Sequence, residues 1–570
     1  MACSAVGCTE WDDHYDNTAA DGVTLWQQMK QNSELSDFCD VLEHTNLFRM
    51  HKKTKASYAE ILNSGQSFTV MAPVNGTFNK DSLIALTETA KGDSVVEKFF
   101  VKNHIARSAN SATATPKTIH MMNDKRVSLL TGSINGVAMK QENIHAKNGI
   151  LNVMERQLPY YYNLYEQMTD RPEYKSVGDF IRSYDREEFD QANSVQNGTV
   201  DGVPVYIDSV MISRNDFLNN YLGAKLASED STYWMVVPKG ASWQAAFDEA
   251  KDCFKYPTSE EKADSLQLLN AYRAMFKDAI FTMTTQKSPA DSLRSLNYNA
   301  SYPEYSVFRK PFAPGGLLDG ATKTTSSNGV LYETDEYPFD PTQTYNRKLE
   351  QEAEYTWYVI NNEKCTYSGR SISADSVSRE GYLDIQPSSN TANWSVKFRL
   401  ADVKSTAYDV CVVLLPQNIT DPEAAAKPYQ FKADIGYIDE NGAKKSYTCS
   451  WIDEKNKKQT KFNTNDPLHV DTVVLAKDFV FPTCNWYEQT NEHFYLTLTC
   501  SMSVPSTSTA SCSSPRLRSR PMSPEMSENR TMNHPTTDKQ IHYDKSFHPK
   551  YQASDAASAV HRLLHGGLGR

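Results

Sequence analysis

One unit of this chain occurs twice in diverged form, and this repeat limits the fold more than any other feature. Residues 68–78, FTVMAPVNGTF, read as an apolar strand that stops at a proline and leads through a turn into a helix, because proline cannot continue a central strand. Residues 233–243, YWMVVPKGASW, show a similar apolar run, the same proline and again a large aromatic residue five positions after it. The repetition predicts two related domains in series.

The pieces on either side of this motif recur in the same order. A helix opens at residues 24–26, and its expected counterpart opens at residues 176–178. A turn and strand at residues 148–153, NGILNV, is matched at residues 328–333, NGVLYE. The separation between matching pieces widens along the chain, which indicates insertions in the second copy. A preserved order with drifting separations favours duplication over coincidence.

The first copy resembles a fasciclin (FAS1) domain. That family has a strand that ends in a proline motif with a following aromatic residue, then a segment with a histidine, then a closing Asn-Gly strand. The matching residues here are Pro73, Asn75, Phe78, His104, Asn148 and Gly149. The resemblance implies a wedge of twisted sheets with packed helices, in which these residues, His104 included, are structural. It also implies an extracellular adhesion or matrix module rather than an enzyme.

The second copy keeps the family pattern less well. Gly240 stands where Asn75 stands in the first copy, and Asp278 lies near the position that corresponds to His104. A ligand function common to both copies therefore does not follow from the resemblance.

The repeat and the change of pattern after it define the expected organisation. We predict an α+β chain of two tandem FAS1-like domains, followed by an all-β sandwich or jelly-roll domain and a disordered tail. A short lipoprotein-like segment precedes the first domain. In chain order, these five parts span residues 1–21, 22–169, 174–345, 350–500 and 501–570.

Between residues 350 and 500 the apolar residues alternate with a period of two, which is typical of half-buried strands. The turn at residues 439–442, Asp-Glu-Asn-Gly, predicts a hairpin, since Asn-Gly tolerates positive φ. Aromatic residues of this region either fill the core or offer flat faces for sugar stacking. Trp357 and Tyr358 are of this kind, and the candidate stacking residues are Trp394, Trp451, Trp486 and Tyr487.

Residues 501–570 differ in composition from the rest of the chain. They are rich in serine and proline, have few aromatic residues and carry an excess of basic over acidic side chains. Such a segment cannot bury enough apolar surface to offset the entropy lost on ordering. Two explanations stay open: a native disordered tail, or loss of the native reading frame near residue 503.

The first residues resemble the end of a bacterial lipoprotein signal. Small residues, Ala5-Val6-Gly7, precede Cys8, and Met1-Ala2-Cys3 is an alternative place for the same feature. An acidic cluster follows Cys8, which is similar to surface lipoproteins of the Bacteroidetes. We expect acylation at Cys8, with Cys3 as the alternative. The protein would then be held at the cell surface, on the outer membrane, by lipid alone.

Several functional classes lack their sequence signatures. With 59 Lys and Arg against 70 Asp and Glu, the formal charge is −11, which disfavours nucleic acid as a partner. No HExxH, GxSxG, Walker or GxGxxG motif occurs, and no two cysteines have CxxC spacing. We therefore expect no catalytic residue, no metal and no cofactor. Ten cysteines in 570 residues do not form a dense disulfide framework, and their pairing is left open.

Two functional hypotheses follow. The first is a non-catalytic cell-surface lipoprotein whose fasciclin domains serve adhesion or bind an extracellular partner. The alternative is a glycan-binding accessory protein of an outer-membrane polysaccharide-import system. The two differ in whether the partner is a protein or a sugar.

Overall fold

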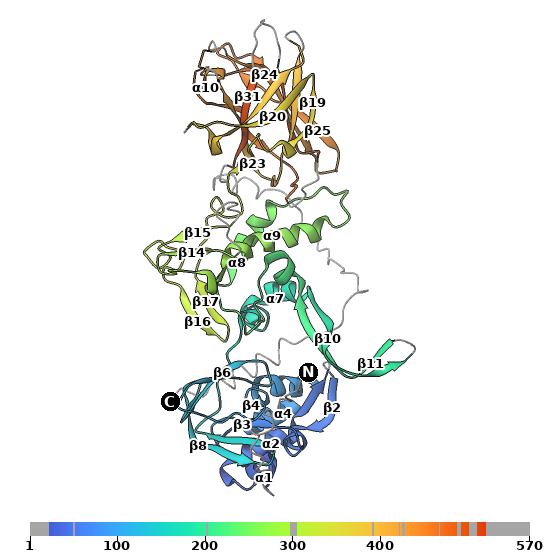
Figure 1. The fold of residues 1–570 in the computed structure, drawn as a ribbon, viewed down its shortest axis with the longest axis vertical. Coiled ribbons are helices and arrows are strands. Elements are labelled where there is room, and N and C mark those ends of the chain that lie inside the picture. The colour runs from blue at the N-terminus through green and yellow to red at the C-terminus, as the bar shows by residue number, and fades with distance from the viewer. Residues whose placement is uncertain are drawn as a thin grey trace, which may run out of the picture.

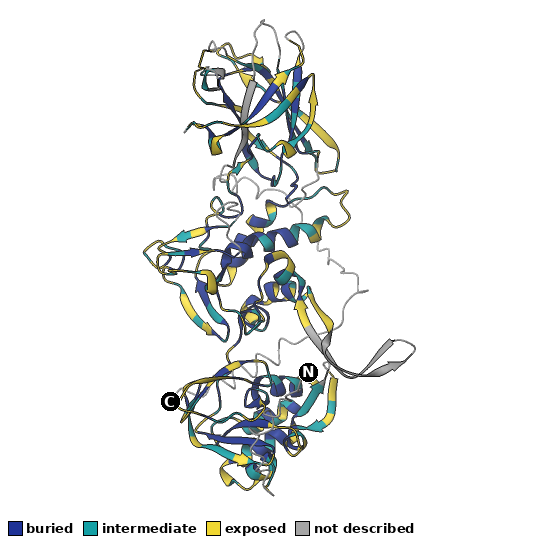
Figure 2. Cartoon of the chain, in the orientation of Figure 1, coloured by how far each residue is buried: buried dark blue, intermediate teal, exposed yellow. Residues whose placement is uncertain are grey.

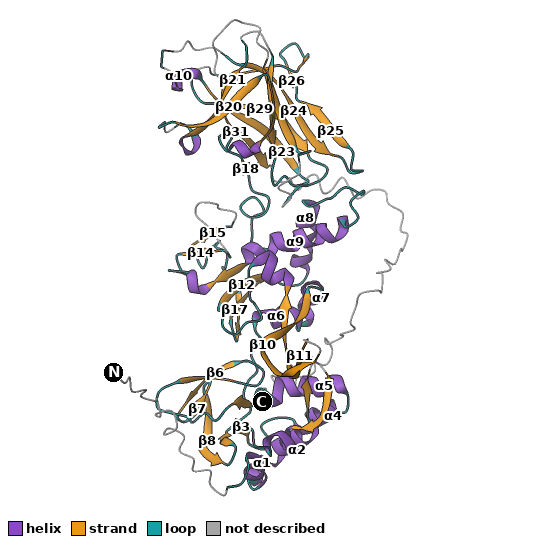
Figure 3. Cartoon of the chain, turned by 45° about the vertical axis from the view of Figure 1, so that its right-hand side comes forward, coloured by secondary structure: helices purple, strands orange, loops and turns teal. Residues whose placement is uncertain are grey.

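The computed structural model of the chain contains three folded bodies in chain order (Figure 1). Helices gather in the first two bodies, and the third is built almost wholly of strands (Figure 3). The candidate residues Cys3, Cys8 and Tyr487 lie outside the described part of the chain. The structure describes residues 22–49, 52–200, 203–296, 305–374, 376–389, 393–420, 422–423, 428–464, 466, 468–486, 492–500 and 510–519.

The first body is built on a seven-stranded sheet. Its strands are β3 (Phe68–Pro73), β4 (Ile105–Arg107), β5 (Lys117–His120), β6 (Arg126–Leu130), β7 (Ser133–Ile134), β8 (Val137–Ala146) and β9 (Gly149–Met154). The strand order is β4-β3-β9-β8-β7-β6-β5. β3 and β9 are parallel to each other and buried along their whole length, and they are the strands on which the helices of this domain pack.

Short helices and one hairpin complete the first body. They are α1 (Leu25–Lys30), α2 (Ser36–His44), α3 (Tyr58–Leu62), α4 (Lys80–Thr87), α5 (Ala90–Val96), the π-helical turn η2 (Glu97–Val101) and the strands β1 (Asn46–Arg49) and β2 (Lys52–Ser57). Leu25, Phe38 and Leu62 from three of these helices share one apolar core with Val70 and Leu151 of the sheet. Their burial holds the helices against the sheet.

Asn148 connects the start of this domain to its central strands. Its Oδ1 accepts a hydrogen bond from the backbone N–H of Leu25 at 2.7 Å. Its Nδ2 donates to the carbonyl oxygens of Leu62 and Ser64 at 2.8 and 2.7 Å. One buried amide therefore joins α1, the turn after α3 and the entry to β9, and it leaves none of these backbone groups unpaired.

The second body repeats this architecture. Its elements are α6 (Leu164–Thr169), α7 (Lys175–Arg182), η4 (Phe217–Leu222), α8 (Ala241–Asp252), α9 (Ala263–Ala279), β10 (Asp185–Val200), β11 (Val203–Asn215), β12 (Tyr233–Pro238), β13 (Ile280–Thr282), β14 (Ser292–Arg294), β15 (Val307–Arg309), β16 (Thr322–Ser326) and β17 (Gly329–Thr334). The order β13-β12-β17-β16 reproduces β4-β3-β9-β8, and β12 and β17 are again parallel.

The second domain has an asparagine with the same contacts, directly before the strand β17 that corresponds to β9. Asn328 accepts a hydrogen bond from the backbone N–H of Leu164 at 2.9 Å. It donates to the carbonyl oxygens of Leu226 and Ser228 at 2.7 and 3.0 Å. The same three connections occur around Asn148, so the second body is a FAS1-like domain even though its sequence is divergent.

The glycine after each asparagine has the same backbone conformation in both domains. Gly149 has φ +147° and Gly329 has φ +152°. A Cβ at Gly149 would collide with the carbonyl oxygen of Phe68, and one at Gly329 with that of Tyr233. Only glycine permits this approach between the two parallel strands.

The second domain begins earlier than its predicted start at residue 174. α6 is opened by a capping box of Asn163 and Glu166, as α1 is opened by one of Thr24 and Gln27. The counterpart of residues 24–26 is therefore the start of α6. The predicted counterpart at residues 176–178 was wrong, because these residues lie in α7, which occupies the place of α2.

A long hairpin is the largest single insertion that separates the two copies. β1 and β2 have 4 and 6 residues, whereas β10 and β11 have 16 and 13. Both hairpins lie between the second helix and the helical turn that precedes the central strand. The insertion therefore extends an existing hairpin and leaves the sheet unchanged (Figure 1).

The third body is a sandwich of two six-stranded sheets. Its elements are β18 (Leu349–Glu350), η6 (Thr356–Tyr358), β19 (Val359–Glu363), β20 (Cys365–Ser371), η7 (Ser378–Glu380), β21 (Gly381–Pro387), β22 (Trp394–Arg399), β23 (Ala407–Leu415), α10 (Gln417–Thr420), β24 (Gln430–Ile438), β25 (Lys444–Thr448), β26 (Trp451–Ile452), β27 (Lys458–Gln459), β28 (Phe462–Asn463), β29 (Asp471–Val480), β30 (Tyr495–Cys500) and β31 (Ala510–Ser519). One sheet has the order β20-β21-β31-β23-β29, and its sixth strand, β18, pairs with β31. The other has the order β19-β22-β30-β24-β25, and its sixth strand, β28, pairs with β24.

A separate apolar core lies between these two sheets (Figure 2). The predicted hairpin at residues 439–442 joins β24 to β25, and Gly442 has φ +87° there. The sandwich does not end at residue 500 as predicted, because β31 pairs with both β21 and β23. Residues 510–519, assigned to the tail from composition, therefore belong to a sheet. Their serine-rich composition did not predict a strand, because the strand is formed by backbone hydrogen bonds and does not require apolar side chains.

We expect Gly149→Ala to lower the free energy of unfolding of the first domain by about 3 kcal/mol, because the added Cβ meets a fixed carbonyl oxygen in a strained backbone. Gly65→Ala is the matched control, since no atom lies within 4 Å of its Cβ position. Denaturant-dependent hydrogen exchange of β3 amides would measure both changes. Equal effects of the two substitutions would contradict the role assigned to Gly149.

Candidate binding surfaces

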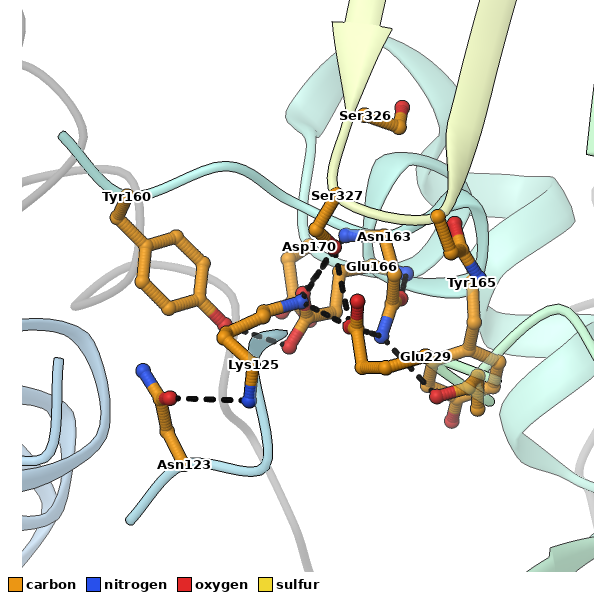
Figure 4. A network of polar contacts seen from close by, with 12 residues as sticks. Asn123, Lys125, Tyr160, Asn163, Tyr165, Glu166, Asp170, Glu229, Ser326 and Ser327 are labelled. Carbon is orange, nitrogen blue, oxygen red and sulfur yellow. Dashed lines mark hydrogen bonds and ion pairs between the residues drawn. The ribbon is translucent and has the colours of Figure 1, made fainter. Parts of the chain in front are cut away.

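The two FAS1-like domains meet at a buried cluster of charges (Figure 4). Lys125, in the turn before β6, is only 4% exposed. Its Nζ lies 2.8 Å from Glu166 Oε2 and 2.7 Å from Glu229 Oε1. It also donates to Ser327 Oγ at 3.0 Å. Every one of these acceptors belongs to the second domain, so a single ammonium group joins α6, the loop before β12 and the turn between β16 and β17.

Glu166 accepts contacts from three side chains of this cluster. Besides Lys125, Lys98 Nζ lies 2.7 Å from its Oε1, and the Tyr160 hydroxyl donates to the same oxygen at 2.8 Å. Burial alone would raise the pKa of Glu166, but the two lysines and their hydrogen bonds hold it at about 2. The carboxylate therefore stays charged through the physiological range, and both of its oxygens are bound by protein groups rather than open to a ligand.

We expect Lys125→Ala to destabilise the domain joint by on the order of 3 kcal/mol, because the buried Glu229 loses its lysine partner and the buried Glu166 loses one of two. Small-angle scattering should show a larger radius of gyration, and the first melting transition should move to lower temperature. Lys140→Ala is the control, since Lys140 pairs with Glu34 on the surface and such pairs contribute less than about 1 kcal/mol. An unchanged scattering profile for Lys125→Ala would contradict this account of the joint.

The residues that carry the family resemblance are structural. Pro73 ends β3 opposite Met154. Asn75 donates to the Ser33 carbonyl at 2.9 Å and accepts from the backbone N–H of Asp37 at 3.0 Å, which fixes the turn after β3 to the start of α2. Asn75 does not cap the following helix, because Asn79 does so through Ser82.

Phe78 and His104 both pack on the ring of Phe100, Phe78 at the margin of the first domain's core and His104 fully buried. The Phe78 ring centroid is 4.9 Å from that of Phe100, and Phe100 lies 4.8 Å from His104. His104 Nδ1 is 2.8 Å from the Phe100 carbonyl oxygen, and its Nε2 accepts from the backbone N–H of Leu158 at 2.8 Å. A neutral imidazole satisfies both contacts, and burial lowers the pKa of His104 to about 4.

We expect the first domain to lose stability as the pH falls from about 6.5 through about 4. The native state binds the His104 proton less readily than the unfolded chain, so the loss approaches roughly 3 kcal/mol at the acid end. His104→Gln should flatten this pH dependence, whereas His120→Gln, on an exposed side chain, should leave it unchanged. Hydrogen exchange of β3 and β9 amides between pH 7 and 4 would measure it. A pH dependence identical in His104→Gln and the wild type would contradict the assignment.

Two of the four candidate stacking residues are buried. Trp394 is 4% exposed and packs in the core of the sandwich. Trp486 is 6% exposed and stacks on Phe254 of the second domain at 4.5 Å. The prediction that these rings offer sugar-binding faces was therefore wrong, because both pack against apolar neighbours. Trp451 is 43% exposed, with its indole N–H bonded to the Lys461 carbonyl at 2.9 Å.

Trp486 instead belongs to the junction between the second and third bodies. Lys277 and Lys404 lie over its ring at 5.7 and 5.2 Å. Backbone hydrogen bonds cross the same junction, from Cys484 N–H to the Lys255 carbonyl and from Ser405 N–H to the Cys253 carbonyl, at 2.8 and 2.9 Å. The third body is therefore seated directly on the second.

The most exposed tryptophan of the described chain lies elsewhere. Trp357, in η6, is 63% exposed, and its ring stacks on Tyr355 with centroids 4.7 Å apart and planes 8° apart. In the sequence, Trp357 is one aromatic residue among others, since no spacing rule shows whether a ring faces solvent. The alternating pattern predicts a strand over residues 355–360, whereas the structure places Trp357 in the short helical turn η6.

Other site types are absent from the part of the chain that the structure describes. No group of three or more His, Cys, Asp or Glu side chains there is arranged to hold a metal ion. In the same residues, no helix combines the length and the apolar character that crossing a bilayer requires.

Comparison with known proteins identifies one domain of the chain. A family model described as the Fasciclin domain matches residues 35–159. No curated protein matches the chain.

Among solved structures, a FAS1 domain pair from the insect cell adhesion molecule Fasciclin I matches with 10% identity over 49% of this chain and 90% of that chain, at a TM-score of 0.17. A Clostridium thermocellum xylanase 10B fragment with CBM22-1 and GH10 modules, complexed with xylohexaose, matches with 10% identity over 30% and 28%, at a TM-score of 0.20. A family 11 carbohydrate-binding module from a C. thermocellum cellulosomal cellulase matches with 12% identity over 30% and 95%, at a TM-score of 0.15. Scores of this size carry no argument, so the fold assignment rests on the family model and the repeated topology.

Proposed function

We propose that this chain, a fasciclin-domain protein by its residues 35–159, is a non-catalytic binding protein of the cell surface. The observation that carries the proposal is the fasciclin domain itself, since such domains are typical of extracellular and cell-surface proteins. The second copy keeps the asparagine and glycine contacts that close the first. Both copies therefore retain the contacts that build the domain. Retention of the fold in this way suits a module that binds a partner or sets a spacing.

The junctions between the bodies support a rigid arrangement of binding surfaces. Lys125 and Glu166 join the first two domains through buried ion pairs, and the stack of Phe254 on Trp486 joins the second domain to the sandwich. Fixed spacing lowers the entropy lost when surfaces on separate domains engage one partner together. In this proposal the fasciclin pair holds the sandwich away from the cell and contributes to adhesion.

The proposal includes a lipid anchor at Cys8. Its support is the sequence alone: small residues precede this cysteine and acidic residues follow it. An acyl anchor would place the chain on the outer surface of a bacterial membrane, as in the Bacteroidetes lipoproteins that it resembles. The folded domains would then project from the membrane without entering it.

Cells that display the full chain should adhere to surfaces coated with extracellular protein or glycan more strongly than cells that lack it. Soluble full chain should compete for this adhesion. Cys8→Ser should remove the chain from the membrane fraction and abolish adhesion, whereas Cys3→Ser, the matched control, should change neither.

Equal adhesion of displaying and non-displaying cells would contradict the binding function. Retention of Cys8→Ser in the membrane fraction, with loss of Cys3→Ser from it, would move the anchor to Cys3.

A second function, a glycan-binding accessory protein of a polysaccharide-import system, is favoured by one observation. The sandwich exposes tryptophan at two separate places, Trp357 and Trp451. Exposed tryptophan faces are the side-chain surfaces on which sugar rings stack most favourably, because the ring is large, flat and apolar on its face. Here the sandwich would capture a polysaccharide and the fasciclin pair would position it.

A further inference from the structure

The stacked pair of Tyr355 and Trp357 is a preformed aromatic platform. The two rings are nearly parallel, with an interplanar angle of 8° and centroids 4.7 Å apart. Trp357 lies on the outside of this pair and is 63% exposed. Because Tyr355 supports the indole from behind, the tryptophan is fixed in orientation while its surface stays open to solvent. A ligand that binds there does not have to order a mobile ring.

A strained loop holds a charged group beside this platform. Arg379 and Glu380, in η7, have φ angles of +50° and +54°, which is the left-handed region that non-glycine residues rarely adopt. Arg379 donates a hydrogen bond from Nη1 to the Tyr355 hydroxyl at 3.3 Å. Two consecutive residues in this conformation persist only when surrounding contacts fix them, and such strain concentrates at binding sites.

Further contacts tie the loop to the chain that precedes the platform. Ser378 Oγ donates to Glu352 Oε1 at 2.7 Å, and Arg379 Nε lies 3.9 Å from the same oxygen. Glu354, the residue before Tyr355, has a buried Oε2 with no hydrogen-bond partner. The segment therefore combines an exposed indole face with a guanidinium group held at its edge and with carboxylates behind it.

We propose that Trp357, Tyr355 and Arg379 form a subsite for one neutral pyranose ring of a glycan. This inference rests on the second proposed function. The axial C–H groups of the sugar would lie on the Trp357 indole, and the half-exposed Arg379 would donate to ring-edge hydroxyls. An apolar face bordered by a fixed polar donor matches the two chemically distinct sides of a pyranose. An apolar peptide side chain would use the indole but not the guanidinium.

The test uses the full chain and a panel of neutral plant and microbial oligosaccharides, with binding measured by calorimetry and by tryptophan fluorescence. Trp357→Ala should weaken binding by about tenfold or more, because the stacking face is removed. Trp357→Phe should retain part of the affinity, and Arg379→Gln should reduce it while the melting temperature stays unchanged. Trp451→Ala is the matched control, since Trp451 is also an exposed tryptophan of the sandwich, and it should bind as the wild type does.

Glycan binding that survives in Trp357→Ala but is lost in Trp451→Ala would overturn the subsite while leaving glycan capture by the sandwich in place. Binding of none of the panel by the folded full chain would overturn both the subsite and the glycan-binding function. That second result would leave adhesion through the fasciclin pair standing, since adhesion is measured separately on displaying cells.

Discussion

One buried asparagine side chain closes each fasciclin-like domain, and the rest of the domain depends on it. Asn148 and Asn328 each bind one backbone N–H at the start of the first helix and two carbonyl groups in the chain that leads to the central strand. These groups come from distant parts of the sequence and would otherwise be buried without partners, which costs about 1–3 kcal/mol each. The following glycine then lets the closing strand approach the central one. The second domain keeps this pair although its sequence has diverged from that of the first.

The two copies differ at positions that do not take part in the asparagine contacts. The extended hairpin β10–β11 grows outward from a position that the asparagine contacts do not involve. At the joint, the capping glutamate of α6 has a second task, since Glu166 both opens the helix and receives Lys125 and Lys98 of the preceding domain. Because the first turn of the second domain is also the contact surface for the first, the angle between the domains is set by the same residues that begin the fold. Tandem order is thus part of the structure and not only of the sequence.

The sequence predicted the repeat, the strand–proline–helix motif and the sandwich because each of these has a local pattern. It misplaced the start of the second domain, because the capping box at Asn163 lies in a tyrosine-rich stretch without apolar periodicity. It missed β31, because a strand made by backbone pairing does not need apolar side chains along its length. It also chose Trp394 and Trp486 as sugar-binding faces. Composition cannot separate a tryptophan in a core from one on a surface, and only the packing of Phe254 on Trp486 decides that case.

The contrast among the tryptophans bears on function. Trp486 is surrounded by an aromatic ring and two lysines at a domain junction, so its large face already stabilises the chain's own architecture. The outer face of Trp357 is exposed and does not pack at a domain junction. Its inner face is supported by Tyr355, and the loop beside it is held in a strained conformation. Folding alone gives no reason to fix an exposed ring and a neighbouring guanidinium in this way, since exposed apolar surface contributes nothing to the core. A ligand that uses both groups supplies that reason, and a sugar ring has the required apolar face and polar edge.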